Sequence, residues 1–405
     1  MKKRIYLLIL FIFSFGLLSN VFTSAILTKD VSLLLSISWC IIGFFYFPDK
    51  KSNYLNTPQN KNIAWILLAS MLISMLTPWI YYNQNIIDTF FSQRFNYIIV
   101  ITLLIFLRIS PTDKDFLYVI KFCAYASIIG FIISIIYPKF YMSAEAVNNL
   151  LERRRELEST DIGFACPGYP LVPFYLFHLI EKILKKSTLH DIIEASIFML
   201  YIIAVQNRST IIGTLPFYCW GILFMKSSKK VFLFIFISII ISIILPFLNH
   251  IYEALSKETQ TQLEDTNYNR WQSISLYLFE MKDNFMSIFF GNGVWSKSGD
   301  YLSIMVKAQE NRGTYISDIG WLGAYFYYGL IPVIILLKFA LKAILKKTIP
   351  LYIKFFSIWL IAVPTIHPYL MLTTVGATEF AMYFYLIIYY TKRVKKIDNN
   401  KIFTN

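Results

Sequence analysis

Long apolar runs alternate with short polar segments from residue 5 to residue 391. A helix needs about 20 apolar residues to cross a bilayer, with a range of roughly 17–25. The pattern therefore predicts an all-α, polytopic membrane protein of about twelve transmembrane helices, which we treat as a single integral-membrane domain over residues 1–405. The predicted spans are 5–27, 31–47, 62–82, 95–109, 116–137, 164–180, 191–206, 209–225, 231–249, 317–337, 349–366 and 375–391.

Two polar segments, 138–163 and 250–316, are longer than the other connections. Within the second, apolar residues recur every three or four positions, which is the spacing of one helix face. This predicts an amphipathic helix that lies on the membrane surface and ends at Gly291 and Gly293. Its apolar face would hold Trp271, Ile274, Leu278, Met281, Phe285 and Ile288.

Composition agrees with a membrane protein, because 57% of the residues are hydrophobic and only 15% are charged. A soluble domain is nearer half apolar and a quarter charged. The four cysteines all lie in apolar runs, so we expect neither a disulfide framework nor a metal cluster. The N-terminal run is long and its cleavage signal is poor, so we expect an uncleaved first span rather than a signal peptide.

The positions of lysine and arginine predict the orientation of the spans. If the N-terminus is cytoplasmic, nearly all of these residues outside the two long segments fall on the cytoplasmic side. The short outer connections hold only Lys29, Arg94 and Arg208. Both termini are therefore predicted to be cytoplasmic, and both long segments to be outer loops. The net charge of +14 is thus explained by topology, without nucleic acid as a partner.

Several kinds of chemistry leave no motif in the sequence. There is no Walker P-loop, no zinc-ligand spacing and no Gly-x-Ser-x-Gly elbow. The first outer loop holds a lone Asp30, whereas many multi-span lipid-sugar glycosyltransferases that use a metal carry a pair of acids there. Lys121 and Lys354 lie one turn inside their spans, where we expect them to snorkel to the inner face.

Arginines on the outer side are the strongest candidates for binding. Arg208 lies in a tight hairpin between the seventh and eighth spans. It is predicted on the outer side, whereas most lysines and arginines are predicted on the cytoplasmic side. It fits an anion site, since the guanidinium binds phosphate through two parallel hydrogen bonds. Contact with a lipid headgroup or with free carbonyl groups explains it equally well. Arg155 ends a run of three arginines among glutamates, a pattern that also fits a solvated helix.

Four segments together resemble the bacterial O-antigen polymerase and O-antigen ligase superfamily. They are "QNRST" (206–210), "NRWQSISLYLF…FFGNG" (269–293), "SDIGWLGAYFYYGLIP" (317–332) and, more weakly, "IGFACPGYP" (162–170). In this chain Asp318 and Ile319 are followed by nine residues and then by Gly329. The ligases carry a histidine at the position of Asp318. That departure puts the ligase reading in doubt and leaves the polymerase reading open.

The resemblance implies a metal-independent polysaccharide polymerase in the bacterial inner membrane, without a cofactor. It would join undecaprenyl-pyrophosphate-linked oligosaccharides on the periplasmic face, with a chain-length regulator protein as a further partner. In this scheme Arg208 and Arg270 hold the leaving pyrophosphate, with Arg155 as a further candidate, and Asp318 accepts the proton of the attacking hydroxyl. Alternatively, Asp318 caps a helix. O-antigen ligase and lipid-linked oligosaccharide flippase are the alternative functions.

Overall fold

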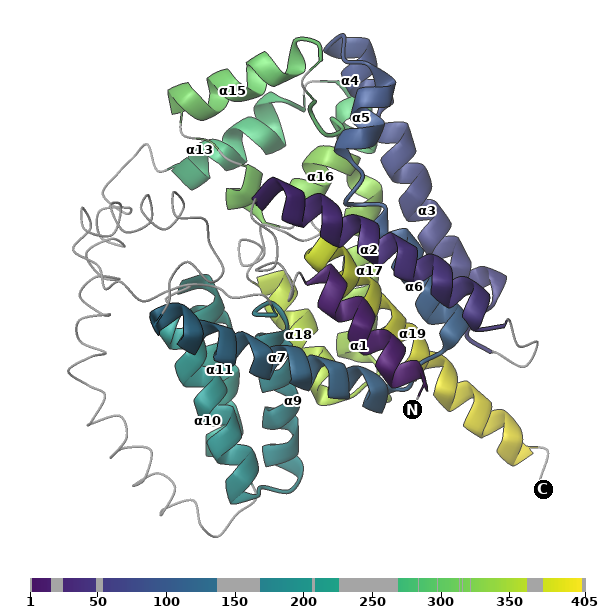
Figure 1. Ribbon diagram of the computed structural model, residues 1–405, viewed down its shortest axis with the longest axis vertical. Coiled ribbons are helices and arrows are strands. Elements are labelled where there is room, and N and C mark those ends of the chain that lie inside the picture. The colour runs from purple at the N-terminus through teal and green to yellow at the C-terminus, as the bar shows by residue number, and fades with distance from the viewer. Residues whose placement is uncertain are drawn as a thin grey trace. The chain divides into compact units, whose positions relative to one another are not determined.

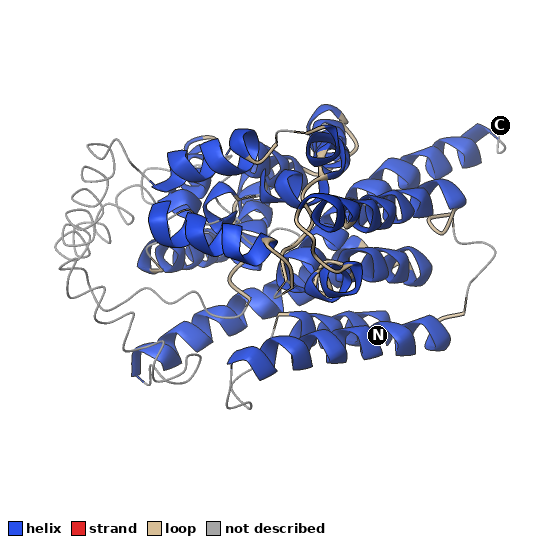
Figure 2. Ribbon diagram, turned by 90° about the horizontal axis from the view of Figure 1, so that it is seen from above, coloured by secondary structure: helices blue, strands red, loops and turns tan. Residues whose placement is uncertain are grey.

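The structure is a computed structural model. It describes residues 2–15, 25–48, 54–136, 168–205, 208–225, 269–282, 284–296, 298–312, 314, 316–320, 322–362 and 374–402. These residues are all-helical and include no strand (Figure 2). They form two compact units, which are described separately. The first unit comprises Met1–Gly16, Lys29–Val119 and Asn269–Asn405, and the second comprises Leu17–Thr28 and Ile120–Tyr268.

The first unit is built around α6, which packs between α3 and α19. Phe106 of α6 lies 5.0 Å from the ring of Phe116 and 5.9 Å from that of Tyr385, measured between ring centroids. Such edge-to-face packing of large buried rings favours one arrangement of the helices. The helices of this unit are α1 (Lys2–Ser14), α2 (Ala25–Tyr46), α3 (Pro58–Ser74), α4 (Leu76–Tyr81), α5 (Ile86–Ser92), α6 (Ile98–Ile109), α13 (Asn269–Ser275), α14 (Phe285–Phe290), α15 (Tyr301–Arg312), α16 (Leu322–Tyr328), α17 (Leu330–Leu345), α18 (Leu351–Ala362) and α19 (Thr374–Ile402).

The second unit has α9 (Leu171–Lys185) at its centre, packed against both α10 (Leu189–Ala204) and α11 (Arg208–Leu223). Most of α7 (Asp113–Ile136) also belongs to it. Gly168 precedes α9 with a φ of +91°, and a Cβ there would lie 2.5 Å from the carbonyl oxygen of Cys123. Glycine is therefore required where the chain passes this close to α7.

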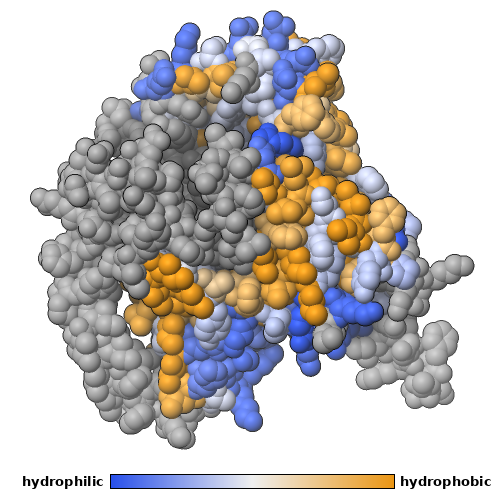
Figure 3. Space-filling model, in the orientation of Figure 1, coloured by the Kyte–Doolittle hydropathy of each residue, from blue (hydrophilic) through white to orange (hydrophobic). Residues whose placement is uncertain are grey.

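Helices overlap every predicted span except 231–249, which lies outside the described residues. Among the residues that the structure describes, two stretches could cross a membrane by length and composition, Pro58–Tyr81 and Asp113–Ser134. Four further apolar helices in this part of the chain are shorter, at 10–17 residues. Many large apolar side chains point outward, among them Leu34, Ile41 and Phe45 of α2. Figure 3 shows such residues as a band over the face in view.

The predicted span 317–337 is wrong as one continuous helix. A 3₁₀ turn, η4 (Ile316–Ile319), is followed by α16 and then by α17, with a break at Gly329. Gly329 has a φ of +74°, and a Cβ there would lie 2.2 Å from the carbonyl oxygen of Phe289. The helix breaks because Pro332 has no amide hydrogen to donate to the carbonyl of Tyr328, which accepts from Ser70 instead. The backbone of Phe289 occupies the space that a side chain at position 329 would need, which explains the glycine.

The predicted amphipathic helix is also interrupted. Helix α13 continues into a π-helical turn, η3 (Leu276–Glu280), and α14 starts anew at Phe285. Asn284 caps α14 by accepting a hydrogen bond from the amide of Ser287 at 2.8 Å. Of the predicted apolar face, Met281 is buried whereas Phe285 and Ile288 are exposed. The cap at Asn284 turns the chain, so the two halves of the pattern no longer share one face.

Within the first unit, segments predicted to be cytoplasmic gather at one end. Lys3 Nζ donates to the carbonyl of Ser110 at 2.9 Å, and Arg4 lies 3.2 Å from Asp115. At the other end, Arg94 pairs with Asp30 at 2.9 Å, and both were predicted on the outer side. Figure 1 shows the two termini at the first end and α4, α5, α13 and α15 at the second.

We expect Gly329→Ala to destabilise the first unit severely. The positive φ alone costs a residue with a side chain about 1–3 kcal/mol, and the Cβ would also overlap the backbone of Phe289. The thermal midpoint of detergent-purified protein measures the loss. Lys307→Ala on the exposed face of α15 is the control and should leave the midpoint unchanged. Equal midpoints for the two variants would contradict this packing.

Candidate functional site

The structure brings together the elements that carry Arg270 and Asp318. Arg270 is the second residue of α13, Asp318 lies within η4, and α13 packs against η4 in the first unit. The side chains of both residues lie outside the description. Because α16 begins only at Leu322, Asp318 does not directly precede that helix.

Arg208 is the first residue of α11 and follows the end of α10 at Ala204 by four positions. This places it in the turn of a helical hairpin, although its side chain is outside the description. Arg208 belongs to the second unit and Arg270 to the first, so their joint action stays a prediction. Arg155 lies outside the described residues, as does the whole of 138–163.

Tyr277 anchors the elements that carry these residues. It lies in η3 and is fully buried, and its hydroxyl donates to the carbonyl of Thr314 at 3.0 Å. Its ring also meets that of Phe326 edge to face, with 5.0 Å between centroids. One side chain thus links the end of α13, the segment before η4, and α16.

The last turn of α16 is held by Lys282. Its ammonium donates to the carbonyls of Tyr325 at 3.0 Å, Phe326 at 3.3 Å and Ser287. The ring of Tyr325 lies 4.2 Å from the nitrogen, which adds a cation–π contact. A cation is favoured here because the last carbonyls of a helix carry partial negative charge. Burial lowers the pKa of Lys282 to about 7, and the three carbonyl acceptors oppose that shift by stabilising the charged form.

The Gly-Asn-Gly segment satisfies the remaining carbonyls of this turn. The amide of Asn292 donates to Phe326 at 2.8 Å, and that of Gly293 donates to Tyr327 at 2.9 Å. Gly291 has a φ of +83°, and a Cβ there would lie 2.3 Å from the carbonyl oxygen of Tyr327. Gly291 therefore lets the backbone of 291–293 approach closely enough to cap α16.

Neutral polar side chains fill the interior beside α16. Asn96 donates to the hydroxyl of Tyr328, and Ser70 of α3 donates to the carbonyl of Tyr328 at 3.2 Å. Gln84 donates to the carbonyl of Val294 at 2.9 Å and accepts from the amide of Ser296 at 2.8 Å. Sequence reasoning missed these residues, because amides at scattered positions form no recognisable spacing. Their only signal was the polar segment between two predicted spans.

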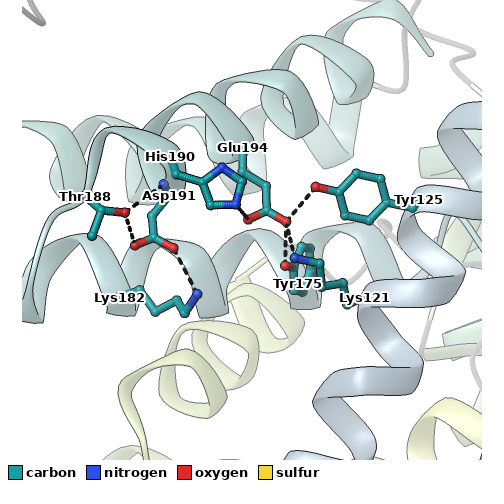
Figure 4. A network of polar contacts seen from close by, with 8 residues as sticks. All are labelled: Lys121, Tyr125, Tyr175, Lys182, Thr188, His190, Asp191 and Glu194. Atoms are coloured by element: carbon teal, nitrogen blue, oxygen red, sulfur yellow. Dashed lines mark hydrogen bonds and ion pairs between the residues drawn. The ribbon is translucent and has the colours of Figure 1, made fainter.

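A second polar cluster lies in the second unit and is centred on Glu194 of α10 (Figure 4). One carboxylate oxygen accepts from the hydroxyls of Tyr125 and Tyr175, each at 2.7 Å, and from Lys121 at 2.9 Å. His190 lies one turn earlier on the same helix, 3.8 Å from the other oxygen. Glu194 is 3% exposed, so its charge is stabilised by these donors rather than by water.

Lys121 was predicted to snorkel to the inner face, which stays a prediction, and its pairing with Glu194 was not foreseen. A lone acid within the predicted span 191–206 was the signal that sequence reasoning overlooked. Thr188 caps the first turn of the same helix by accepting from the amide of Asp191 at 3.1 Å, and the Asp191 carboxylate accepts from Lys182 at 2.9 Å. Within the described part of the chain, no group of three histidine, cysteine or acidic residues is arranged to hold a metal ion.

We expect the stability of the first unit to rise between about pH 7 and pH 10. Burial puts the pKa of Lys282 at about 7 in the folded protein, and a lysine in the unfolded chain titrates near 10.4. The unfolded chain therefore binds more protons within this window, so raising the pH favours folding. The thermal midpoints of the wild type and of Lys282→Met, measured over the same pH range, isolate the contribution of the Lys282 amine to stability. Parallel pH profiles would mean that the carbonyls keep the amine charged throughout.

No protein-family model, curated protein or solved structure matches this chain. The resemblance to the O-antigen polymerase and ligase superfamily therefore rests on the motifs of the sequence. Two of these motifs, 269–293 and 317–332, lie against each other in the structure through the contacts of α16 described above.

Proposed function

We propose that this chain is a polysaccharide polymerase of the bacterial inner membrane. It joins oligosaccharide repeat units carried on undecaprenyl pyrophosphate, on the periplasmic face, with about twelve transmembrane helices. The observation that carries the proposal is the packing of α13, with Arg270, against η4, with Asp318. A cation and a carboxylate on neighbouring elements provide the two kinds of group that this transfer needs.

Three features of the first unit support its placement in a membrane. Large apolar side chains are exposed along α2 and α3, including Phe45 and Trp65. Contiguous exposed apolar surface on this scale is unusual for a soluble monomer. Lys3 and Arg4 contact the segment 110–115 at one end of the unit, where Figure 1 also marks both termini, and the pair of Arg94 with Asp30 lies at the other. This is the arrangement that the positive-inside rule requires.

The proposed chemistry is attack by a sugar hydroxyl of the acceptor on the anomeric carbon of the donor. The carbon–oxygen bond to pyrophosphate breaks as the new glycosidic bond forms. Negative charge then grows on the lipid pyrophosphate, where Arg270 and Arg208 stabilise it, with Arg155 as a further candidate. Asp318 accepts the proton of the hydroxyl. No metal is needed if the arginines carry the charge.

Ligation of the finished glycan to lipid A-core uses the same donor and the same leaving group. The motif that separates the two reactions is the position of Asp318, where the ligases carry histidine. A carboxylate supports the polymerase assignment over the ligase. A deletion strain distinguishes them, because loss of a polymerase leaves core with one repeat unit on a gel of surface polysaccharide. Core without any repeat unit would contradict the proposal.

Arginine variants test the pyrophosphate site. We expect Arg270→Lys and Arg208→Lys to abolish the polymer ladder in the complemented deletion strain, because lysine cannot bind phosphate through two parallel hydrogen bonds. Arg94→Lys is the matched control, since Arg94 is an outer arginine that already pairs with Asp30, and it should give a normal ladder. Normal ladders from both test variants would contradict a role of Arg270 and Arg208 in binding pyrophosphate.

Asp318→Asn separates the two roles considered for this residue. Asparagine caps a helix about as well as aspartate does, but it cannot accept a proton. We therefore expect a loss of about 10²–10⁴-fold in polymerisation rate, with some activity kept by Asp318→Glu. The ladder of chain lengths measures the effect, and membrane levels of the protein serve as the control. An Asn variant with a normal ladder would exclude Asp318 as the base.

Transport of a lipid-linked oligosaccharide is a second candidate, favoured by Glu194, a buried carboxylate that pairs with the exposed Lys121. Ionisable residues within membrane helices often mark transport pathways. For a polymerase we expect Glu194→Gln to lower the thermal midpoint, because Lys121 loses its partner, and to keep the polymer ladder. Glu181→Gln is the control, since Glu181 pairs with the exposed Lys185. Loss of every repeat unit in Glu194→Gln alone would favour transport over polymerisation.

A further inference from the structure

Four aromatic rings come together at the end of the first unit that holds α4, α5 and α15 (Figure 1). Tyr82, between α4 and α5, stacks on Tyr301 of α15 with 4.4 Å between centroids and 10° between planes. Trp295 lies 6.4 Å from the ring of Tyr301 and 5.6 Å from that of Tyr327. Tyr301 and Tyr327 are buried, whereas Tyr82 and Trp295 are partly exposed and form the accessible edge of this aromatic cluster.

The backbone around the aromatic cluster is held in place from both sides. The amide of Asp300 donates to the carbonyl of Tyr82 at 3.1 Å, and Gln84 bonds both Val294 and Ser296 on either side of Trp295. Gly299 has a φ of +73°, and a Cβ there would lie 2.7 Å from the carbonyl oxygen of Asn83. The rings are therefore presented on a fixed support, which lowers the entropic cost of binding a ligand.

A polar group accompanies the rings. Asp300 is exposed and directly precedes Tyr301 in the chain. The hydroxyl of Tyr301 donates to the carbonyl of Gly293 at 3.4 Å, which holds this ring against the segment that carries Trp295.

The chemistry of the cluster selects its ligand. Among the described residues named above, the only charge is the carboxylate of Asp300, so nothing here attracts a pyrophosphate. Aromatic faces carry negative quadrupole density and attract the polarised C–H bonds of a sugar ring. Amide and carboxylate oxygens accept hydrogen bonds from sugar hydroxyls. A sugar offers C–H bonds to the rings and hydroxyls to the Asp300 carboxylate, so it matches both kinds of surface.

We propose that Tyr82, Trp295 and Asp300 form a binding site for sugar residues of the oligosaccharide, separate from the arginines that would hold its pyrophosphate. Trp295 and Tyr82 stack on a sugar ring, and Asp300 accepts from its hydroxyls. The inference rests on the proposed function only in the choice of glycan. Division of the substrate between the two sites explains how a charged head and a neutral sugar chain are held at once.

Direct binding tests the inference with lipid-free glycan. Purified full-length protein in detergent is titrated with oligosaccharides of one to three repeat units, released by mild acid from the surface polysaccharide of the same strain. We expect Trp295→Ala to weaken binding at least about tenfold, which corresponds to 1.4 kcal/mol. Trp295→Phe keeps a ring and should stay within about threefold of the wild type.

Trp79→Ala is the matched control, because Trp79 is an exposed tryptophan of α4 in the same unit, outside the aromatic cluster. It should bind as the wild type does. If Trp295→Ala fails to fold, Asp300→Ala decides the question, since its exposed position leaves packing intact and the loss of its acceptor oxygens should lower the affinity several-fold. Absence of binding to the wild type would overturn the inference, as would equal affinities for the Trp295→Ala and Trp79→Ala proteins, or an unchanged affinity for the Asp300→Ala protein if that variant is used instead.

The outcome is distinguishable from failure of the proposed function. A deletion strain that keeps its full polymer ladder would exclude the polymerase assignment, whatever the binding result. Glycan binding that depends on Trp295 in that case would still support the sugar site. A deletion strain that loses its ladder, together with Trp295→Ala binding as the wild type, would remove only the sugar site.

Discussion

The carbonyl groups at the end of α16 constrain the whole first unit. A helix that ends in a buried setting must find donors for its last carbonyls, since each one left unpaired costs free energy. Here the donors come from Lys282, the backbone of 292–293, Gly329 and Ser70. Segments more than two hundred residues apart are thereby joined at a single turn of helix, and the glycines of 291–293 and 329 are the consequence of that close contact.

The proposed site depends on this junction. Helix α13 and turn η4 are short elements, and neither could hold a fixed position alone. Tyr277 and Lys282 attach them to α16, so Arg270 and Asp318 are carried on one block of structure. The aromatic cluster of Tyr82, Trp295, Tyr301 and Tyr327 joins the same block through Tyr327 and the segment that follows Gly293. Charge recognition and sugar recognition are thus proposed for two parts of one rigid assembly.

Much of the helical architecture could be predicted from hydrophobic runs, because a helix in apolar surroundings needs apolar residues along its length. The turn before Arg208 was predicted from that pattern. The pairing of Asp30 with Arg94 was not, although both residues were predicted on the outer side. The break at Gly329 had a signal in Pro332, three residues later, which interrupts the span because proline cannot donate to the carbonyl of Tyr328. The close contact of Gly329 with residues 289–290, distant in sequence, could not be predicted.

The buried polar groups were harder still to predict. Glu194 becomes a hub only because Tyr125, Tyr175 and Lys121 converge on it from two other helices. Periodicity reports which face of a helix is apolar and says nothing about which donors meet an acceptor. The amphipathic pattern of 269–288 was misleading for a similar reason, since the cap at Asn284 reorients the chain and leaves Phe285 exposed.

The central claim is that the junction at α16 and the elements attached to it face the periplasm. Cysteine accessibility tests it most directly, in a functional background in which the native cysteines are replaced. Single cysteines at Ser303 on α15 and at Lys307 on the same helix should react with a membrane-impermeant maleimide in cells whose outer membrane alone is permeabilised. A cysteine at Lys346, after α17, should react only once the inner membrane is opened. Labelling with the opposite pattern would place the junction in the cytoplasm and contradict the account.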